Sequence, residues 1–146
     1  MNRQKESIAI KFYKLERWFY IHKMKIIAKI IYHLMQIILG CTIPYTAVLE
    51  KGVDIAHFHG IVIHHKSKIG KGTIIYQNVC IGGRNGKGGA IIGENCVLGA
   101  GCCILGEIKI GDCVNVGANA VVLKDTPSNC TVVGIPAKIV KKEKDN

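Results

Sequence analysis

Chemistry in this chain could begin with its histidines, four of which fall within nine residues: His57, His59, His64 and His65. An imidazole exchanges a proton near neutral pH and can therefore act as a general base. A zinc site would need ligands that converge from several segments, and neither the histidines nor the seven cysteines show such a spacing. We expect His57 and His59 to share a strand face, whereas His64 and His65 are interpreted as tolerated polar residues at a corner.

A glycine-rich stretch at residues 82–89 contains two further cations, Arg84 and Lys87. It is not a Walker phosphate loop, because its glycines are too close together and Gly88 stands where Ser or Thr should follow the lysine. Loops on a rigid scaffold often carry binding residues. The alternative is a flexible surface excursion, and glycine content alone does not choose between the two.

A six-residue repeat must position these side chains. Its aliphatic positions are Ile43, Leu49, Ile55 and Ile61, then, after a two-residue slip, Ile63, Ile69, Ile75 and Ile81, and, after an eleven-residue gap, Ile92, Leu98, Ile104, Ile110, Val116 and Val122. A helix repeats its apolar face near 3.6 residues and a strand near 2, so this period indicates short stacked strands. We expect a β-solenoid of about five coils, from which the glycine-rich stretch projects as a loop.

Residues 3–39 follow another pattern, with apolar side chains three, four and seven apart and basic residues between them. They predict a basic amphipathic helical segment that stops near Gly40. The most apolar run, residues 26–39, is too short to span a bilayer. The segment could lie on an anionic leaflet or cover the open end of the solenoid. We favour the cover, because an uncapped solenoid exposes strand edges.

Composition agrees with one domain of 146 residues, and 49% of these are apolar. The formal net charge is +10, but the basic residues of the repeat are scattered and no aromatic platform accompanies them, which disfavours nucleic acid. Cys96 and Cys102 occupy the small inward position of the repeat and are interpreted as core residues. An odd cysteine count without a signal peptide favours reduced thiols in the cytoplasm.

The motifs together resemble a known family. They are the run from His57 to Ile63, Ile81-Gly82-Gly83 with its loop, Leu98-Gly99-Ala100-Gly101, Gly117-Ala118-Asn119-Ala120 and Gly134-Ile135-Pro136-Ala137-Lys138. This pattern is similar to hexapeptide-repeat acyltransferases, in particular to serine acetyltransferases and related polysaccharide O-acetyltransferases. The resemblance implies a left-handed parallel β-helix. We therefore divide the chain into a helical segment at residues 1–40, a left-handed β-helix acyltransferase domain at 41–140 and a basic C-terminal tail at 141–146.

The resemblance implies direct acetyl transfer from acetyl-CoA to a hydroxyl, without a metal, and it makes His57 the general base. The coenzyme-binding residues that it implies are Ala100, Ala118, Lys124, Lys138 and Lys141, although the last two lysines could also be part of a solvated tail. His59, Arg84 and Lys87 are candidate acceptor-binding residues. Active sites between neighbouring subunits imply a homotrimer. A peripheral contact of residues 1–40 with the inner face of the membrane is a further possibility.

Departures from the family pattern bear on the acceptor. Ala56 stands where serine acetyltransferases have Asp, a second acidic position falls at Thr42, and the loop lacks their Arg-His pair. Serine is a zwitterion and needs an anion for its ammonium group, whereas a neutral sugar does not. We therefore predict a saccharide acceptor, with L-serine as the alternative and a non-catalytic β-helix scaffold as a second alternative.

Overall fold

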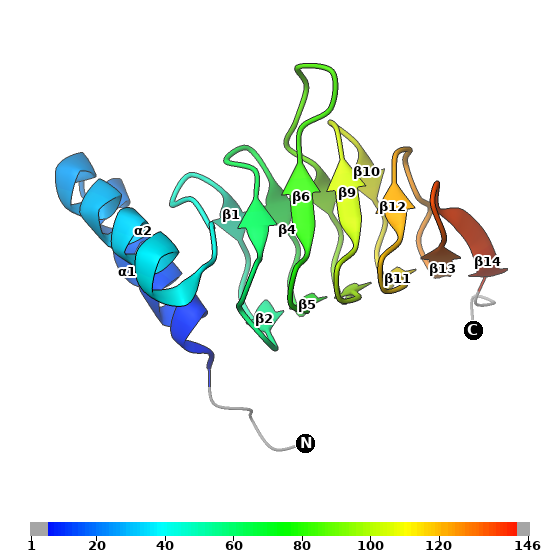
Figure 1. Ribbon diagram of the computed structural model, residues 1–146, viewed down its shortest axis with the longest axis horizontal. Coiled ribbons are helices and arrows are strands. Elements are labelled where there is room, and N and C mark those ends of the chain that lie inside the picture. Colours follow the sequence, from blue (N-terminus) through cyan, green and yellow to red (C-terminus); the bar gives the residue numbers. More distant parts are fainter. Residues whose placement is uncertain (1–5, 143–146) are drawn as a thin grey trace.

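The computed structural model describes residues 6–142. Two N-terminal helices are followed by a long three-sided coil (Figure 1). The helices are α1 (Ile8–Ile21) and α2 (Lys25–Leu39). The predicted helical segment is therefore confirmed, but it is broken where Lys23 adopts a left-handed φ of 62°. It ends as predicted at Gly40, whose left-handed backbone (φ 61°) forms the C-cap of α2.

Each face of the coil is a sheet in which corresponding strands of successive coils pair in parallel. The first sheet holds β1 (Val48–Leu49), β4 (Lys68–Ile69), β7 (Ile91–Ile92) and β10 (Lys109–Ile110). The second holds β2 (Asp54–Ile55), β5 (Ile74–Ile75), β8 (Val97–Leu98), β11 (Asn115–Val116), β13 (Cys130–Val133) and β14 (Lys138–Lys142). The third holds β3 (Val62–Ile63), β6 (Cys80–Gly82), β9 (Cys103–Leu105) and β12 (Val121–Val122). Among the strands of residues 6–142, only β14 runs antiparallel, against β13.

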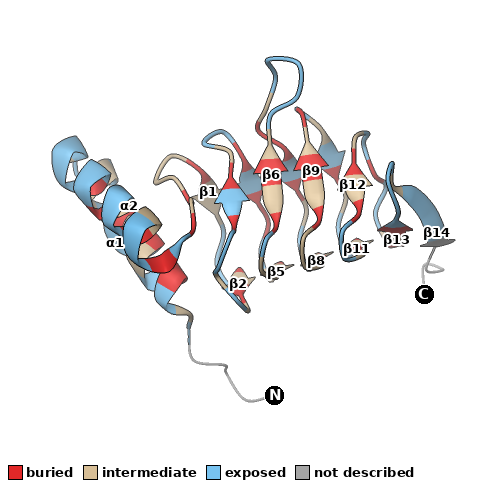
Figure 2. Ribbon diagram, viewed as in Figure 1, coloured by how far each residue is buried: buried red, intermediate tan, exposed pale blue. Residues whose placement is uncertain are grey.

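The coil thus has four complete turns, with one strand of each turn in each sheet, rather than the predicted number of about five. The length of the repeat region allows about five turns, but the projecting loop uses part of it, and β13 begins a fifth turn in the second sheet alone. The aliphatic positions of the repeat are buried along the axis, except Leu49 in the first turn, which is half-buried (Figure 2). Cys96 and Cys102 are also fully buried there, as predicted.

The two helices cover the N-terminal end of the coil (Figure 1). The Tyr13 hydroxyl donates to the Ala47 carbonyl (2.9 Å) and accepts from the Leu49 amide (3.1 Å). Arg17 donates to the carbonyls of Tyr45 (2.8 Å) and Ala47 (3.0 Å). These bonds satisfy backbone groups at the start of the first coil that have no preceding coil to pair with.

Glu16 is buried at this junction, and neither of its carboxyl oxygens has a hydrogen-bond partner among residues 6–142. Desolvation by burial raises the pKa of Glu16 to about 9, because the charged form would lose its hydration without gaining a counterion. The carboxyl is therefore neutral at physiological pH.

In the described part of the chain, neither helix combines the length and the apolar character that a membrane crossing requires.

Candidate active site

His57 lies at the corner between β2 and β3, which is two residues longer than the corner stacked on it. Ile55 pairs with Ile75 on the second sheet, and the register of β3 with β6 places Ile61 level with Val79. Five residues join Ile55 to Ile61, whereas three join Ile75 to Val79. The longer corner carries the exposed His57 away from the coil, so the two-residue slip in the repeat marks this corner.

Two expectations about this region are wrong. His57 and His59 do not share a strand face, because both belong to the turn that the insertion creates. Ile61 is not an aliphatic ladder residue, since the insertion shifts it into the position that Cys102 and Ala120 occupy in later coils. Phe58 stacks on His59 with ring centroids 4.4 Å apart, which gives this turn an aromatic surface.

Successive corners place His59 in one column with two of the predicted coenzyme-binding residues. After each corner, a backbone amide donates a hydrogen bond to the corner carbonyl of the preceding coil. These bonds run from Asn78 to His59, from Gly101 to Gln77 and from Asn119 to Ala100, and each is 2.9 Å long. The column therefore runs His59, Gln77, Ala100, Ala118. Ala118 is exposed and Ala100 is half-buried, so their small side chains leave an open surface beside the coil.

Gln77 belongs to the same column, and the sequence analysis missed it. Its side-chain oxygen is buried and has no hydrogen-bond partner within residues 6–142. Such an oxygen is costly to leave unpaired, which makes it a candidate acceptor for a ligand's N–H group. Its place in the repeat, level with His59 and Ala100, is the sequence signal that could have identified it.

The corner next to His59 requires glycine. Gly60 has a left-handed φ of 71°, and a Cβ there would lie within contact distance of the Asn78 side chain stacked on it, only 3.1 Å from its Cγ. Asn78 is itself left-handed, with φ of 58°. Asparagine tolerates this conformation better than most residues. The turn that presents His57 and His59 is thus fixed on one side by backbone geometry.

The predicted loop leaves the coil after β6 and is the most prominent projection in Figure 1. Arg84 and Lys87 close its tip, with backbone N···O distances of 2.6 and 3.0 Å. His64 supports the loop, because a Cβ at Gly88 would lie only 2.7 Å from the His64 Nε2 atom. Desolvation, followed by the nearby His65 and Lys66, lowers the pKa of His64. His64 is therefore a packing residue beneath the loop.

Arg84 also lines a cavity of about 390 Å³ together with Lys124 and Lys138. Its guanidinium lies 3.5 Å from the carbonyl oxygen of Leu123, which turns it toward the later coils. The side chain of Lys141 lies outside the described part of the structure. Asp125 is the one acid in the lining, and its carboxylate accepts a hydrogen bond from the Lys109 amide at 2.9 Å. The remaining excess of positive charge suits a polyanion such as a nucleotide phosphate. Lys87 does not line this cavity.

Within one chain, the candidate residues occupy two different corners of the coil. His57, His59, Ala100 and Ala118 lie where the second sheet turns into the third. The loop and Lys124 lie where the third sheet turns into the first. The single chain therefore does not bring the imidazole together with the cations of the loop.

The structure gives His57 no orienting partner, since no hydrogen bond among residues 6–142 ends on its imidazole. Thr42, at the second acidic position of the family pattern, accepts a hydrogen bond from Gln36 of α2 at 3.3 Å. Thr42 thus ties the helices to the first coil.

Comparison with known proteins shows which proteins this chain is similar to. Residues 89–124 match the family model described as bacterial transferase hexapeptide (six repeats). A serine acetyltransferase of Synechococcus elongatus is 38% identical over 135 residues, which is 90% of this chain and 55% of that protein. The Neisseria gonorrhoeae serine acetyltransferase solved with serine has a TM-score of 0.86 at 32% identity, over 91% of this chain and 55% of that one. A serine acetyltransferase solved with CoA has a TM-score of 0.85 at 31% identity, over 90% and 55%.

As its motifs indicated, the chain is similar to the hexapeptide-repeat transferases, whose family model matches residues 89–124. Within this family, its relatives are the serine acetyltransferases, and the chain spans little more than half of their length. The predicted preference for a saccharide acceptor is contradicted, because relatives that match nine tenths of the chain are serine acetyltransferases. The departures at Ala56 and Thr42 were too few to outweigh the similarity of the whole coil.

Proposed function

We propose that this chain is an acetyl-CoA-dependent O-acetyltransferase that acts on L-serine, the reaction that serves cysteine biosynthesis. The observation that supports this most directly is the likeness to serine acetyltransferases over 90% of the chain, at 38% identity. The solved relatives that hold serine and CoA support the two substrates.

His57 is the general base of the proposed reaction. A serine hydroxyl is a poor nucleophile until an imidazole removes its proton as the new bond forms. The serine oxygen then attacks the thioester carbonyl of acetyl-CoA, the C–S bond breaks, and the proton held by His57 passes to the departing thiolate. The exposed position of His57 on the lengthened corner supports this role, because substrates can reach it from solvent.

The coenzyme is proposed to lie along the column of Ala100 and Ala118, with its phosphates near Lys124 and Lys138. Small side chains let the pantetheine arm approach the backbone, and the basic cavity supplies charge for the phosphates. Lys141 remains a candidate for the same role.

Recognition of serine requires a cation for the carboxylate and an acceptor for the ammonium. We assign the first to Arg84 or Lys87 of the loop. His59 and the unpaired oxygen of Gln77 are candidates for the second, because both lie in the corner column beside His57. This arrangement would replace the acid that is absent at Ala56.

A site that uses both corners needs two chains, so the proposal includes a homotrimer in which His57 of one subunit meets the loop of the next. The division of the candidate residues between two corners supports this. A closed ring of three also satisfies the symmetry of head-to-tail contacts. The cytoplasmic location expected from the sequence is part of the same proposal.

His57→Ala tests the assignment of the base. We expect turnover with serine and acetyl-CoA to fall about 10²- to 10⁴-fold, the usual contribution of general-base catalysis. Calorimetry should show unchanged CoA binding. The matched control is His33→Gln, which alters an exposed histidine on α2 and should leave turnover unchanged. Full activity of His57→Ala would refute the assignment, and absence of CoA binding by the unaltered chain would favour a scaffold.

A further inference from the structure

Helix α2 has a buried and an exposed apolar face, and Lys25, Lys29, His33 and Gln36 occupy the polar side between them. One face packs inward through Ala28, Ile31, Met35 and Leu39, which are all buried. The other is exposed to solvent and consists of Ile26, Ile27, Ile30, Leu34, Ile37 and Ile38. Ile26 and Ile37 are 78% and 81% exposed. Exposed isoleucine and leucine side chains that form one continuous face of a helix mark an interaction surface, so the outer face of α2 is a candidate binding surface.

Helix α1 extends this surface. Ile8, Leu15, Trp18 and Ile21 are exposed on it, with Trp18 49% exposed. Trp18 and Ile21 border a groove that α1 forms with residues 49–53 of the first coil, whereas Ile8 and Leu15 do not line it. The packing of the helices against the coil therefore leaves the outer face of α2 uncovered, together with Ile8 and Leu15 of α1.

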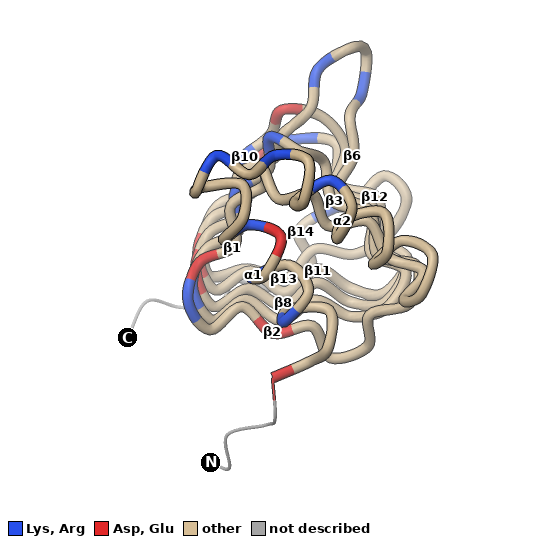
Figure 3. Tube along the Cα trace, turned by 90° about the vertical axis from the view of Figure 1, so that its left-hand side faces the viewer, with Lys and Arg blue, Asp and Glu red and all other residues tan. Residues whose placement is uncertain are grey.

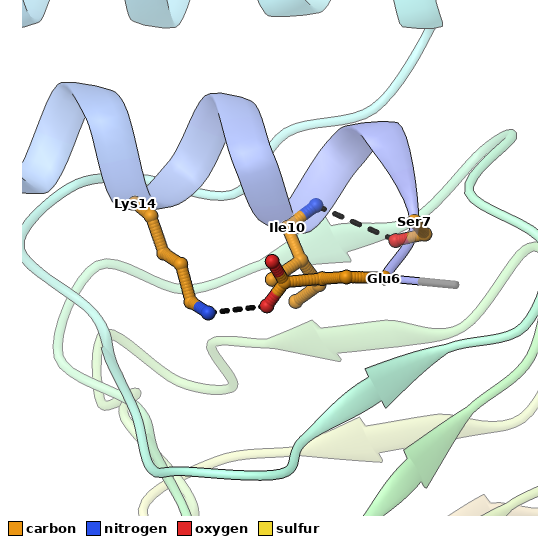
Figure 4. A network of polar contacts seen from close by, with 4 residues as sticks. All are labelled: Glu6, Ser7, Ile10 and Lys14. Atoms are coloured by element: carbon orange, nitrogen blue, oxygen red, sulfur yellow. Dashed lines mark hydrogen bonds and ion pairs between the residues drawn. The ribbon is translucent and has the colours of Figure 1, made fainter. Parts of the chain in front are cut away.

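The charge around the surface is strongly positive. The exposed cations of the helical region are Lys11, Lys14, Lys23, Lys25 and Lys29. Figure 3, which looks onto the helical end, shows these basic segments along the helices. Of the two acids there, Glu16 is buried and neutral at physiological pH, and Glu6 is paired with Lys14 beside the Ser7 cap of α1 (Figure 4). The exposed field is therefore almost entirely basic.

We propose that the outer face of the helical hairpin binds an anionic lipid surface. Isoleucine, leucine and tryptophan side chains flanked by lysines are what an interfacial helix needs, since the apolar groups enter the acyl boundary and the ammonium groups meet lipid phosphates. Charge complementarity selects this occupant. A second copy of the chain would bring the same excess of lysines against this surface, and like charges in contact oppose association.

The orientation that follows places the first coil next to the membrane. The helices pack on the end of the coil that carries β1, β2 and β3 (Figure 1). The corner that presents His57 belongs to this coil and is therefore the one nearest the lipid. The C-terminal hairpin β13–β14 lies at the opposite end.

Vesicle co-sedimentation of the full chain tests the proposal. We expect the protein to pellet with vesicles of phosphatidylcholine and phosphatidylglycerol, and to remain in solution with phosphatidylcholine alone. Two double variants, Ile30→Ser with Ile37→Ser and Lys25→Glu with Lys29→Glu, should each weaken partitioning at least about tenfold. Ile91→Ser, an exposed isoleucine on β7, is the matched control and should bind as the unaltered chain does.

Size measurements without vesicles separate the lipid from a protein occupant, and circular dichroism checks that each variant keeps its helices. Lipid binding without a change in oligomeric size between the variants supports the proposal. Equal binding to both kinds of vesicle would overturn the role of charge. No binding to either, with a smaller assembly in the isoleucine variant, would overturn the proposal and make this face an interface between copies.

Discussion

His57 takes its position from the length of its corner rather than from contacts of its own side chain. The two inserted residues lift the imidazole out of the coil, while Gly60 and Asn78 fix the turn behind it. Gln77 contributes differently, because its buried oxygen is fixed in place by the coil and lacks a partner. The first coil thus holds the proposed general base, His57, and the second coil holds the candidate hydrogen-bond acceptor, Gln77.

Gln77→Leu should test the second of these groups. Removal of an acceptor that pairs with a substrate N–H should raise the KM for serine about tenfold, while the thermal midpoint stays the same or rises because an unpaired polar atom is lost from the apoprotein. Steady-state kinetics and thermal melts measure the two effects. A lower midpoint with unchanged KM would instead identify Gln77 as a structural residue.

The helical hairpin is joined to the coil by two kinds of contact that respond differently to pH. Tyr13 and Arg17 hydrogen-bond to backbone carbonyls of the first coil, and Glu16 is buried without any partner. Burial of a polar group without a hydrogen bond is destabilising, more so when the group is charged. The packed junction therefore requires Glu16 to be protonated.

Glu16 should make the stability of the folded chain fall as pH rises. The folded state holds a proton with a pKa of about 9, whereas the unfolded chain releases it near 4.5. The free energy of unfolding is thus highest below about pH 4.5. Between about pH 4.5 and pH 9 it falls by up to about 1.4 kcal/mol per pH unit. Glu16→Met should remove this slope and raise the free energy of unfolding at pH 8 by about 2 kcal/mol or more.

Urea titrations across this pH range provide the measurement. Glu6→Gln is the matched control, because Glu6 is an exposed acid on the same segment and its loss should change stability by no more than about 1 kcal/mol. A Glu16→Met variant that keeps the pH slope of the unaltered chain would show that Glu16 is not the group that titrates.

Sequence periodicity predicted most of the elements but not their details. The period of six located the coil, the gap before Ile92 located the loop, and Gly40 marked the end of the helices. It misplaced Ile61, because an insertion changes the phase of a repeat in the same way wherever it falls. The sequence therefore did not show that the two extra residues lengthen the corner before Ile61. The break at Lys23 was also missed, since no proline or glycine accompanies it.

At the scale of the molecule, the candidate site residues lie at two different corners of the solenoid. The motifs named these candidates but did not predict their separation, because motifs give order along the chain and not the face on which each residue falls. The acceptor was predicted wrongly since single positions, Ala56 and Thr42, were weighed above the similarity of the whole coil.

Mixing two inactive variants tests the arrangement between subunits. We expect His57→Ala and Arg84→Ala chains to be weakly active alone and to recover activity when they are refolded together. In a random mixture, about a quarter of the junctions unite an intact His57 with an intact Arg84 across the interface. Activity near a quarter of the unaltered level is therefore expected, and a mixture no more active than its components would place the site within one chain.

The most direct measurement is the release of free thiol from acetyl-CoA by the purified chain with L-serine as the acceptor, with a panel of saccharides in parallel. The account predicts serine-dependent release, with O-acetylserine as the product in mass spectra and no release above background with the sugars. Release with a saccharide and none with serine would contradict it.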